Sequence, residues 1–392
     1  MAKKVAILGS TGSIGKNALR VIDSLNSKEK GFEVTALSAH NNVELLAKQI
    51  RQWKPEFVVI TNQQNYNKLK ELTSGCETQI LSGAEGMVEI AQLETNDIVL
   101  SAVVGLAGLP AVLAAAKKGK RLAIANKEPL AVAGRLVTET ARDSGAQLLP
   151  IDSEHSAIFQ ALCAGKPEEV AKIILTTSGG PFRKSTIEQM RIVTVEQALA
   201  HPVWNMGPKI TIDSATMMNK ALEVIEARWL FDMPIEKIEV LVHPESIIHS
   251  LVEFIDGSVI AQMSQPDMVL PIQYALTWPN RQAGLAKRLE LDQIGRLSFE
   301  KPDTKKFKAL KICFDVARAG GTAPAVFNAA NEAAVELFLA GRIKFLGIIE
   351  LIEHCLNKHN IAAQAGLEEI LEADQWARKM VLEAVKKETV GK

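Results

Sequence analysis

Cysteine is scarce and widely spaced in this chain. Its 392 residues include four cysteines, Cys76, Cys163, Cys313 and Cys355, and no C-x-x-C pair occurs. Zinc ribbons and disulfide frameworks both need cysteines at short, regular spacings, so neither is supported. We expect the protein to work in a reduced, cytoplasmic setting.

The chain also lacks an excess of either charge. Lys plus Arg and Asp plus Glu each number 45, which gives a formal net charge of +0. A nucleic-acid-binding protein would show a basic surplus, so we expect no nucleic-acid partner. Internal repeats and low-complexity tracts are absent from the sequence as well. The overall composition is that of an ordinary globular protein.

No segment of the sequence predicts a membrane span. Residues 99–116 carry no charge, but Gly105, Gly108 and Pro110 interrupt the run. A spanning helix needs about 20 apolar residues. We interpret the run as a buried strand, a glycine-rich loop and a helix that Pro110 opens. Because the first strand is predicted to start at Lys4, we expect neither a signal nor a transit peptide.

The first 150 residues alternate between apolar runs and helical patterns. Predicted strands cover residues 4–8, 32–38, 57–60, 79–81, 98–103, 121–125 and 146–151. Predicted helices cover residues 16–25, 43–53, 64–74, 83–93, 109–118 and 133–144. This alternation predicts an α/β fold with an N-terminal Rossmann-like, doubly wound parallel sheet.

The pattern changes after residue 150, and a chain of this length is too long for one core. Strands are predicted at 173–177, 238–242, 249–254 and 258–264, the last three of them antiparallel, with a helix at 215–231. Helical patterns follow at 310–319, 323–339, 345–357 and 367–388. We therefore expect an α+β catalytic domain and a C-terminal helical domain.

A glycine-rich loop joins the first predicted strand to the first predicted helix. Gly9, Gly12 and Gly15 follow a G-x-x-G-x-x-G spacing, a variant of the dinucleotide-binding fingerprint. Glycines let the backbone turn tightly and approach a pyrophosphate, and the helix N-terminus offers free N–H groups to it. The alternative is a tight turn in an unrelated α/β protein.

The end of the second predicted strand favours NADP over NAD. Folds that prefer NAD usually place an acid here to hold the ribose 2′-hydroxyl. This chain has Ala39, His40, Asn41 and Asn42 instead, so a 2′-phosphate would not be repelled. No Arg or Lys stands among them either. The alternative for His40 is a histidine in a solvated loop with no role in binding.

Asp152 and Glu154 follow the strand predicted at 146–151, and a helical pattern over 156–164 follows them. In an extended segment, residues two apart point the same way, so the two carboxylates would hold one hard cation or share one proton. A capped helix start is the alternative. Lys127 lies at the carboxyl end of another strand, where ligands bind in open α/β sheets, unless it is a surface lysine.

Three later segments carry polar groups in patterns that suit a phosphorylated ligand. Ser178 opens a Ser-Gly-Gly turn that suits an oxyanion, although a plain turn is the alternative. Residues 200–207 hold His, Trp and Met between Pro and Gly, which suggests a lid or a long connection. On the predicted helix, Asn219, Lys220 and Glu223 share one face, either as a phosphate and metal site or as a surface ion pair.

Seven ordered blocks resemble the 1-deoxy-D-xylulose 5-phosphate reductoisomerase family. They are GSTGSIG at 9–15, NKE at 126–128, IDSEHSAIFQ at 151–160, TSGGPFR at 177–183, HPVWNMG at 201–207, DSATMMNKALEVIEARWLF at 213–231 and HPESIIHS at 243–250. The resemblance extends over essentially the whole chain. Ala221 stands where many members carry glycine, and we expect little effect from a methyl group in a helix.

The resemblance implies an activity, cofactors and partners. Members of the family reduce and rearrange 1-deoxy-D-xylulose 5-phosphate to 2-C-methyl-D-erythritol 4-phosphate with NADPH and Mg²⁺ or Mn²⁺, in non-mevalonate isoprenoid synthesis. The expected partner is a small sugar phosphate, with no membrane partner, and the expected assembly is a homodimer. The expected domains are NADPH-binding (1–150), catalytic (151–278, with a lid at about 179–208), linker (279–309) and C-terminal helical (310–392).

The resemblance also implies roles for individual residues. The metal ligands would be Asp152, Glu154 and Glu223. The cofactor-binding residues would be Thr11, Gly12, Ser13, Ile14, Ala39, His40, Asn41, Asn42, Asn126, Glu128 and Gly207. The substrate-binding residues would be Lys127, Ser153, Glu154, Ser178, His201, Trp204, Met206, Ser214, Asn219, Lys220 and Glu223. The catalytic residues would be Lys127, Glu154, His201 and His249.

These residue types fit one chemistry. Three carboxylates suit a hard divalent cation, which stabilises oxyanion charge on the substrate. The carbon skeleton then rearranges by a retro-aldol/aldol sequence or by an α-ketol shift, and the nicotinamide reduces the new aldehyde. A semialdehyde dehydrogenase would instead need a nucleophilic cysteine, and Cys163 has no histidine close in sequence. An inactive NADP sensor would have lost the acids, which are present here.

Overall fold

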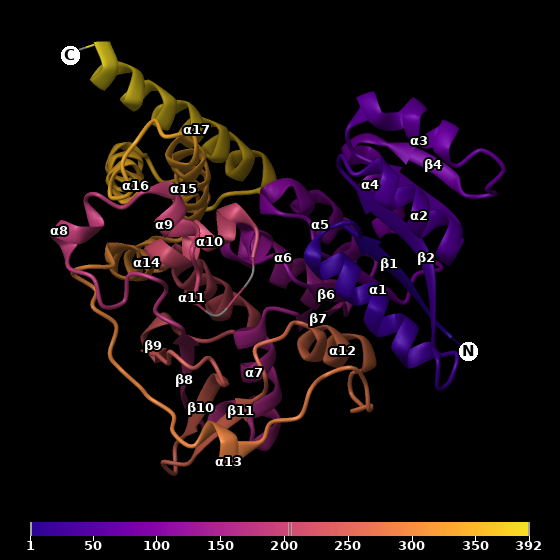
Figure 1. Ribbon diagram of the computed structural model, residues 1–392, viewed down its shortest axis with the longest axis horizontal. Helices are drawn as coiled ribbons and strands as arrows, with labels where there is room; N and C mark the ends of the chain where they lie inside the picture. The colour runs from indigo at the N-terminus through magenta and orange to yellow at the C-terminus, as the bar shows by residue number, and fades with distance from the viewer. Residues whose placement is uncertain (1, 203, 205, 391–392) are drawn as a thin grey trace. The chain divides into compact units, whose positions relative to one another are not determined.

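The computed structural model describes residues 2–202, 204 and 206–390 (Figure 1). Residues 203 and 205 of the predicted lid and residues 391–392 of the predicted C-terminal domain lie outside the described residues. The chain divides into two compact units. The first contains Met1–Pro129, Val137–Phe159 and Asp267–Arg288, and the second contains Leu130–Leu136, Gln160–Pro266 and Leu289–Lys392.

The first unit is built on a seven-stranded sheet in which every pair of neighbours is parallel. The strands are β1 (Lys3–Leu8), β2 (Phe32–Ala39), β3 (Phe57–Ile60), β4 (Gln79–Ser82), β5 (Ile98–Ser101), β6 (Arg121–Ile124) and β7 (Gln147–Pro150). Their order is β4-β3-β2-β1-β5-β6-β7. The chain therefore winds outward in both directions from β1, which confirms the predicted Rossmann-like fold. The carboxyl ends of β1 and β5 meet at the switch point, where such folds bind their ligands.

Helices alternate with these strands. They are α1 (Ser13–Asn26), α2 (Val43–Trp53), α3 (Tyr66–Leu72), α4 (Gly83–Ala91), α5 (Leu109–Lys117), α6 (Glu128–Ser144) and α7 (Ser153–Ala161), with short 3-10 turns at Gln63–Asn65 and Gly105–Gly108. Helix α6 starts five residues before the predicted position and has a non-helical residue, Ala133, inside it. The apolar faces of these helices bury the sheet, because parallel strands need cover on both sides.

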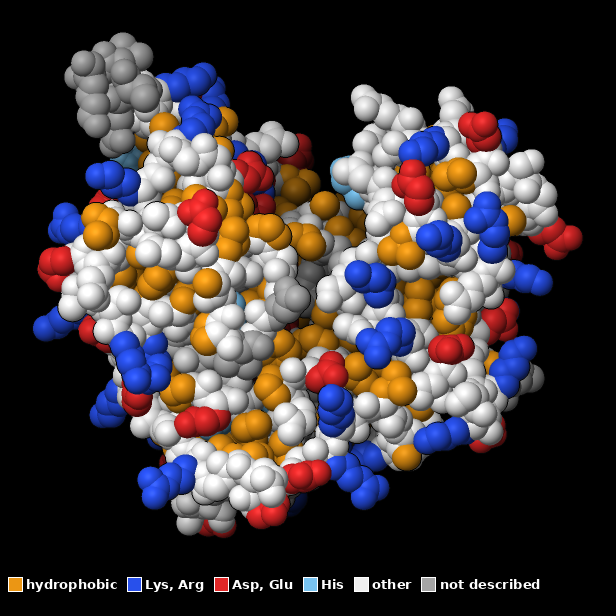
Figure 2. Space-filling model, in the orientation of Figure 1, with side chains coloured by type: hydrophobic (Ala, Val, Ile, Leu, Met, Phe, Trp, Pro, Cys, Tyr) orange, Lys and Arg blue, Asp and Glu red, His pale blue; other side chains and the backbone are white. Residues whose placement is uncertain are grey.

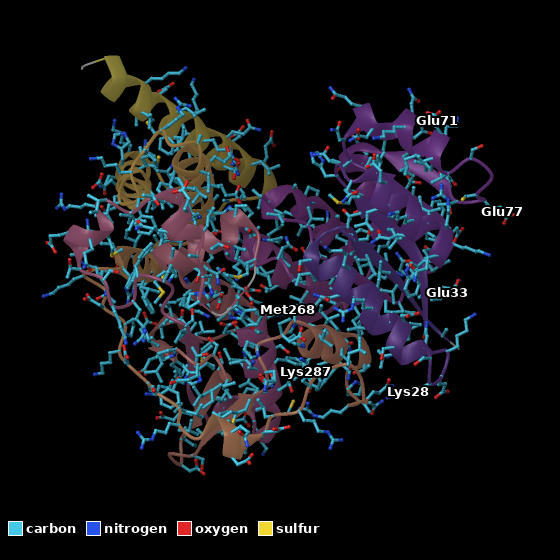
Figure 3. The ribbon with its side chains drawn as sticks, in the orientation of Figure 1. Lys28, Glu33, Glu71, Glu77, Met268 and Lys287 are labelled. Carbon is cyan, nitrogen blue, oxygen red and sulfur yellow. The ribbon has the colours of Figure 1, made fainter. Side chains whose placement is uncertain are left out.

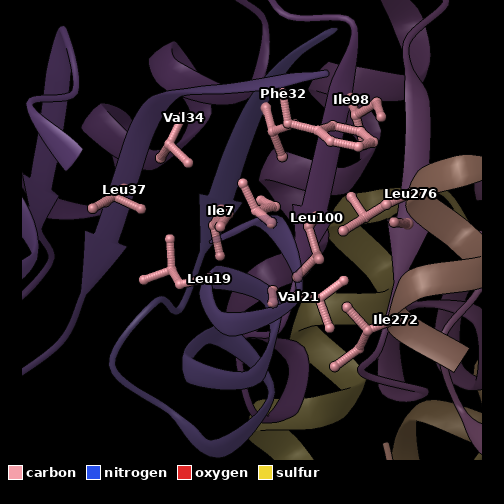
Figure 4. Packing of buried hydrophobic residues seen from close by; sticks show 14 of the residues in the cluster. Ile7, Leu19, Val21, Phe32, Val34, Leu37, Ile98, Leu100, Ile272 and Leu276 are labelled. Atoms are coloured by element: carbon pink, nitrogen blue, oxygen red, sulfur yellow. The ribbon is translucent and has the colours of Figure 1, made fainter. Parts of the chain in front are cut away.

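The core of the first unit includes a helix that the sequence did not predict. Residues Val21 and Ile22 of α1 pack with Leu100 of β5 and with Ile272 and Leu276 of α12 (Val269–Thr277), all at most 1% exposed (Figure 4). The chain returns to this unit after residue 266. Lys28 helps to hold the returning segment, since its Nζ donates to the carbonyl oxygen of Ala283 at 2.8 Å. Figure 3 labels Lys28, and also Met268, which lies immediately before α12.

The second unit has a four-stranded mixed sheet in the order β11-β10-β8-β9. Its strands are β8 (Val170–Thr177), β9 (Ile238–Val242), β10 (Ile248–Phe254) and β11 (Val259–Met263). β10 is antiparallel to both β8 and β11, but β9 pairs with β8 and is parallel to it. The predicted antiparallel pairing of β9 is therefore wrong. A long helical crossover separates β8 from β9, and such crossovers join parallel strands.

Helices make up the rest of the second unit. They are α8 (Ile187–Met190), α9 (Val195–Leu199), α10 (Pro208–Thr216), α11 (Met218–Leu230), α13 (Leu291–Ile294), α14 (Lys308–Ala319), α15 (Ala323–Leu339), α16 (Gly347–Lys358) and α17 (Leu367–Val390). Short 3-10 turns cover Leu162–Ala164, Pro167–Glu169 and Ile235–Lys237. α15 is buried along most of its length and contacts α10, α11, α14, α16 and α17. A helix that is apolar all round needs such cover on every side.

The helix predicted at 215–231 is two helices. Met217 adopts a left-handed conformation, with a φ of 63°, and ends α10 before α11 begins at Met218. Left-handed backbone cannot continue a right-handed helix. Ser214 therefore lies on α10, whereas Asn219, Lys220 and Glu223 lie on α11.

The distribution of charged side chains on the surface agrees with the formal net charge of +0. Acidic and basic side chains are interspersed over the face shown in Figure 2. Among the residues that the structure describes, no helix is long and apolar enough to cross a membrane.

Candidate active site

Two of the three glycines in the loop after β1 are required by the fold itself. Gly9 has a φ of +86°, and a Cβ there would lie 2.5 Å from the carbonyl oxygen of Ala102. A Cβ on Gly15 would lie 2.4 Å from the carbonyl oxygen of Gly9. Gly12 is different, because its φ of −72° suits any residue and a Cβ there would keep 3.4 Å from the oxygen of Gly9. The loop therefore leaves room at Gly12, where a ligand can approach the backbone closely.

The same loop leaves the N-terminus of α1 open. The helix begins at Ser13, three residues before the predicted start, and no side chain caps it. Its first turn holds no acidic residue. Gly12 and Ser13 are exposed, and Thr11 and Ile14 are half-buried. The free N–H groups and the helix dipole together favour an anion here, as the glycine spacing predicted.

The polar residues after β2 are tied to neighbouring loops. His40 Nδ1 lies 2.8 Å from the Thr61 hydroxyl, and Asn41 accepts a hydrogen bond from the Asn62 amide at 2.8 Å. Asn42 caps α2 by accepting from the backbone N–H of Leu45 at 3.1 Å. His40, Asn41 and Asn42 are all exposed, while Ala39 is buried. This strand end presents amide and imidazole groups and no carboxylate, so it would not repel a 2′-phosphate.

Asn126, Lys127 and Glu128 are buried where β6 leads into α6. The Asn126 amide oxygen accepts a hydrogen bond from the Ser101 hydroxyl at 2.8 Å, which joins the ends of β5 and β6. Lys127 Nζ lies 2.5 Å from Asp152 Oδ2, and both side chains are largely buried. The surface-lysine interpretation of Lys127 is therefore wrong. A largely buried ion pair is costly to build for stability alone, which makes it a candidate for function.

Asp152 and Glu154 lie at a helix start and not in an extended segment. The carbonyl oxygen of Asp152 accepts from the N–H of Ser156 at 2.8 Å, so the first helical turn already begins there. α7 starts at Ser153, three residues before the predicted position, and the Ser153 hydroxyl donates to Glu154 Oε2 at 2.5 Å. The extended geometry predicted for the pair is wrong, because the helix begins sooner than its apolar pattern does. Carboxylates also complement the positive end of the helix.

The second unit carries three polar residues together on α11. Asn219 Nδ2 donates to Glu223 Oε1 at 2.6 Å, and Lys220 Nζ is paired with Glu223 Oε2. This confirms that the three side chains share one face. Lys220 is 2% exposed and Glu223 is 0% exposed, so the interpretation as a surface ion pair is wrong. A buried charged pair of this kind is a poor source of stability and a good candidate site.

Ser178 and His201 come together at the end of β8. The Ser178 hydroxyl lies 3.3 Å from His201 Nε2, and the backbone N–H of Trp204 donates to His201 Nδ1 at 2.9 Å. Burial lowers the pKa of His201, which favours the neutral ring. In a neutral ring that accepts at Nδ1, the proton is on Nε2 and points at Ser178. His201 therefore orients the hydroxyl through one defined tautomer.

The other predicted residues of this unit lie on separate elements. The turn after Ser178 packs against α10, because a Cβ on Gly180 would lie 2.7 Å from the carbonyl oxygen of Ser214. Gly207 is the N-cap of α10, and Met206 directly before it is half-buried. His249 is buried in β10. Val203 and Asn205 of the predicted lid lie outside the described residues.

The sequence did not predict a role for two buried polar residues. Asp213 on α10 accepts from Asn331 Nδ2 of α15 at 2.8 Å and pairs with Lys209 Nζ at 2.6 Å. This network fixes the helix that carries Ser214. His155 is fully buried on α7, with Nδ1 3.9 Å from Asp152 Oδ2. The spacing of Asp152 and His155 was a visible signal, but nothing in the sequence pairs Asp213 with a residue 118 positions later.

Comparison with known proteins identifies the family to which this arrangement belongs. The sequence model of the 1-deoxy-D-xylulose 5-phosphate reductoisomerase family matches residues 5–134. Sequence models of the C-terminal domains of this family match residues 148–231 and 263–380. A protein of that name from Pelotomaculum thermopropionicum is 51% identical over 385 residues, which cover 98% of this chain and 99% of the relative. The chain belongs to the 1-deoxy-D-xylulose 5-phosphate reductoisomerase family.

Other reductoisomerases are similar to this chain over nearly its full length. A Clostridium perfringens relative is 48% identical over 383 residues, covering 97% of this chain and 99% of its own. A solved reductoisomerase from Zymomonas mobilis in complex with NADPH has a TM-score of 0.91 and 42% identity, covering 98% of this chain and 99% of that one. A solved DOX-P reductoisomerase in complex with NADPH, fosmidomycin and magnesium has a TM-score of 0.92 and 42% identity, covering 98% of each chain. The predicted resemblance is confirmed.

Two of the four cysteines of this reductoisomerase-family chain do not favour the semialdehyde dehydrogenase alternative. Burial raises the pKa of the Cys355 thiol to about 11, and it raises the pKa of Cys313 as well. Thiols with raised pKa values are poor nucleophiles, since the thiolate is the reactive form.

Proposed function

We propose that the chain converts 1-deoxy-D-xylulose 5-phosphate to 2-C-methyl-D-erythritol 4-phosphate, using NADPH and a divalent metal ion, in non-mevalonate isoprenoid synthesis. The observation that carries this proposal is full-length similarity to reductoisomerases, including solved complexes with NADPH and with NADPH, fosmidomycin and magnesium. The enzyme is an NADP-dependent oxidoreductase of this family.

The first unit is suited to hold NADPH. The open N-terminus of α1 and the free space at Gly12 fit the pyrophosphate, with Thr11, Ser13 and Ile14 beside it. The loop after β2, from Ala39 to Asn42, would face the 2′-phosphate. We assign Asn126 and Glu128 to the nicotinamide end, because they follow the carboxyl end of β6, which pairs with the switch-point strand β5. Gly207 is proposed as a further cofactor contact.

The metal site is proposed to use Asp152, Glu154 and Glu223, with Mg²⁺ or Mn²⁺ as the ion. Carboxylate oxygens are the ligands that both hard cations prefer, so the donor set fits. A bound divalent cation supplies Lewis-acid polarisation of the carbonyl and hydroxyl oxygens of the substrate. Lys127, at the start of α6, and Ser153, at the start of α7, would orient the substrate hydroxyls, and Lys127 holds Asp152 in place through its 2.5 Å contact.

The substrate phosphate is proposed to bind at α11 and the turn after β8. Lys220 supplies the positive charge, Asn219 an amide donor, and Ser178 and Ser214 hydroxyls. Neutral His201 keeps the Ser178 hydroxyl directed. His201, Trp204 and Met206 would cover the bound substrate and exclude water, while His249 would line the pocket. Binding of the phosphate, which does not react, then supplies the energy for closing this cover.

We further propose a cytoplasmic homodimer. A cytoplasmic setting is supported by four free cysteines among the described residues. The domain division proposed is residues 1–150 for NADPH, 151–278 for catalysis with the lid at about 179–208, 279–309 as linker and 310–392 as the helical domain. Light scattering of the purified protein would test the dimer.

A direct assay tests the proposed function. NADPH absorbance should fall only when 1-deoxy-D-xylulose 5-phosphate and Mg²⁺ or Mn²⁺ are both present, and a chelator should stop the reaction. NADH should support slower turnover, because only NADPH carries the 2′-phosphate. Folded protein that shows no turnover with both components would overturn the proposal.

Two glycine substitutions separate cofactor binding from folding. Gly12→Ala should leave the melting temperature within a few degrees of the wild type, since the site accepts a Cβ, and should weaken NADPH binding about tenfold through the lost close approach. Gly15→Ala should instead destabilise the protein by about 1–3 kcal/mol, because its Cβ would meet backbone atoms. Calorimetry and NADPH titration check both. Equal effects of the two variants on stability would contradict this division.

A further inference from the structure

The second unit contains a cavity of about 190 Å³ that none of the proposed catalytic residues lines. Its walls come from residues 132–136, the C-terminal end of α11, the loop between α14 and α15, and the segment that leads into α17. Two arginines, Arg135 and Arg228, are among the lining residues, and no acidic residue is. The cavity therefore brings two positively charged side chains together around a small space.

Arg228 lacks a partner for part of its guanidinium. Its Nη1 atom is buried and has no hydrogen-bond partner within the described part of the chain. The guanidinium carbon lies 5.0 Å from the centroid of the Trp229 ring, which holds the side chain in place. Arg135 Nη2 donates to the carbonyl oxygen of Ala365 at 3.0 Å. Leaving a charged donor buried and unsatisfied is costly, and a bound oxyanion would satisfy it.

The N-terminus of α15 adds to the same positive field. Pro324 in the first turn of this 17-residue helix lines the cavity, and the first turn holds no acidic residue. The N-cap Thr322 does not cap the helix. Its hydroxyl instead lies 2.7 Å from His359 Nε2 and accepts from the N–H of Ala362 at 3.0 Å. The helix dipole thus directs its positive end toward the cavity, and among the described residues no acidic side chain stands in the first turn of α15 or lines the cavity.

We propose that this cavity is a second anion site, which binds a small phosphate-bearing ligand such as inorganic phosphate or a small phosphate ester. Arg228 and Arg135 would bind the phosphate oxygens, in the fork geometry that guanidinium groups offer. The volume is below the range of pockets that bind drug-sized ligands, so it suits a small anion better than a nucleotide. The competing interpretation is that Arg228 is held only by its contact with Trp229.

A label on Trp229 reports this site directly. The protein with 5-fluorotryptophan in place of its five tryptophans gives a ¹⁹F resonance for Trp229, which the Trp229→Phe variant assigns. Titration with inorganic phosphate at constant ionic strength should shift this resonance with saturation. Arg228→Gln should weaken the apparent affinity about tenfold or more, the effect of one charge-assisted hydrogen bond. Arg342→Gln is the matched control, because Arg342 is exposed and lies outside the cavity.

A second variant keeps the guanidinium and changes only the charge at the cavity. Ala319 is an exposed lining residue at the end of α14, so Ala319→Glu should fold normally and also weaken phosphate binding about tenfold. Ala340→Glu, at the exposed end of α15, should change nothing. This pair decides the question even if Arg228→Gln does not fold.

The substrate site needs to be excluded as the source of the signal. Ser178→Ala should leave the phosphate affinity reported by Trp229 unchanged, since Ser178 does not line the cavity. The proposal is overturned if phosphate does not shift the Trp229 resonance, if Ala319→Glu has no effect on the titration, or if Ser178→Ala weakens it as much as Ala319→Glu does.

Discussion

The Glu223→Gln enzyme is expected to bind NADPH normally and to lose about 10³-fold in metal-dependent turnover. Glutamine keeps the size of the side chain and one oxygen for the Asn219 amide, which donates to Glu223 Oε1 at 2.6 Å. It removes the negative charge that we propose holds the metal ion. A metal ion supplies several kcal/mol of transition-state stabilisation, and each 1.36 kcal/mol is about tenfold in rate.

The measurements are kcat at saturating Mg²⁺ and Mn²⁺ and the Kd for NADPH. Glu332→Gln is the matched control, because it removes a carboxylate from another ion pair of the second unit, in which Glu332 is 14% exposed and its partner Arg378 is 33% exposed. This control should cost stability and leave kcat within about twofold. Loss of NADPH binding equal to the loss of turnover would show that Glu223 supports the fold and not the metal site.

Local patterns predicted the parts of the site that one element builds. The i, i+3 and i, i+4 spacings placed Lys220, Asn219 and Glu223 on one helical face, and the contacts confirm it. The glycine spacing predicted a strand–turn–helix, and Gly9 and Gly15 are indeed required for its close backbone packing. These features depend on geometry within a few residues, which is what a sequence pattern encodes.

Contacts between distant segments could not be predicted in this way. The helix break at Met217 depends on a left-handed residue that has no glycine or proline to mark it. α12 joins the core of the first unit although more than a hundred residues of the second unit precede it, so its sequence neighbours did not indicate where it packs. The hydrogen bond from Asn331 to Asp213 likewise joins α15 to α10, two helices that only the tertiary fold brings together.

The Asp152 segment shows why residue identity was easier to predict than geometry. Paired carboxylates after an apolar strand suggested a site, and the residues fit a metal-ligand set. The extended geometry was wrong because α7 begins at Ser153, before the apolar positions that reveal its period. Polar residues in the first turn of a helix carry no periodic signal, although their side chains are favoured there by the helix dipole.

The Lys127→Met enzyme is expected to lose about 10²-fold in kcat, the usual effect of losing a group that orients the reacting atoms. Lys127 Nζ lies 2.5 Å from Asp152 Oδ2, and the two side chains are 9% and 13% exposed. The simplest alternative is that Lys127 only neutralises Asp152. A metal ion is itself a cation, so it would replace that role, and saturating Mg²⁺ would then restore activity.

We expect the opposite result, because Lys127 is proposed to orient the substrate hydroxyls as well. Removal of a competing cation should leave the metal affinity of Lys127→Met unchanged or tighter, while kcat stays low at every metal concentration. Lys120→Met is the matched control, since Lys120 lies in the same unit and its Nζ donates to the backbone oxygens of Glu94 and Asn96 at 2.8 and 2.7 Å. Full recovery of Lys127→Met at high Mg²⁺ would assign Lys127 to the charge balance of Asp152 alone, since a lysine that contacts the reacting hydroxyls cannot be replaced by an ion bound to the carboxylates.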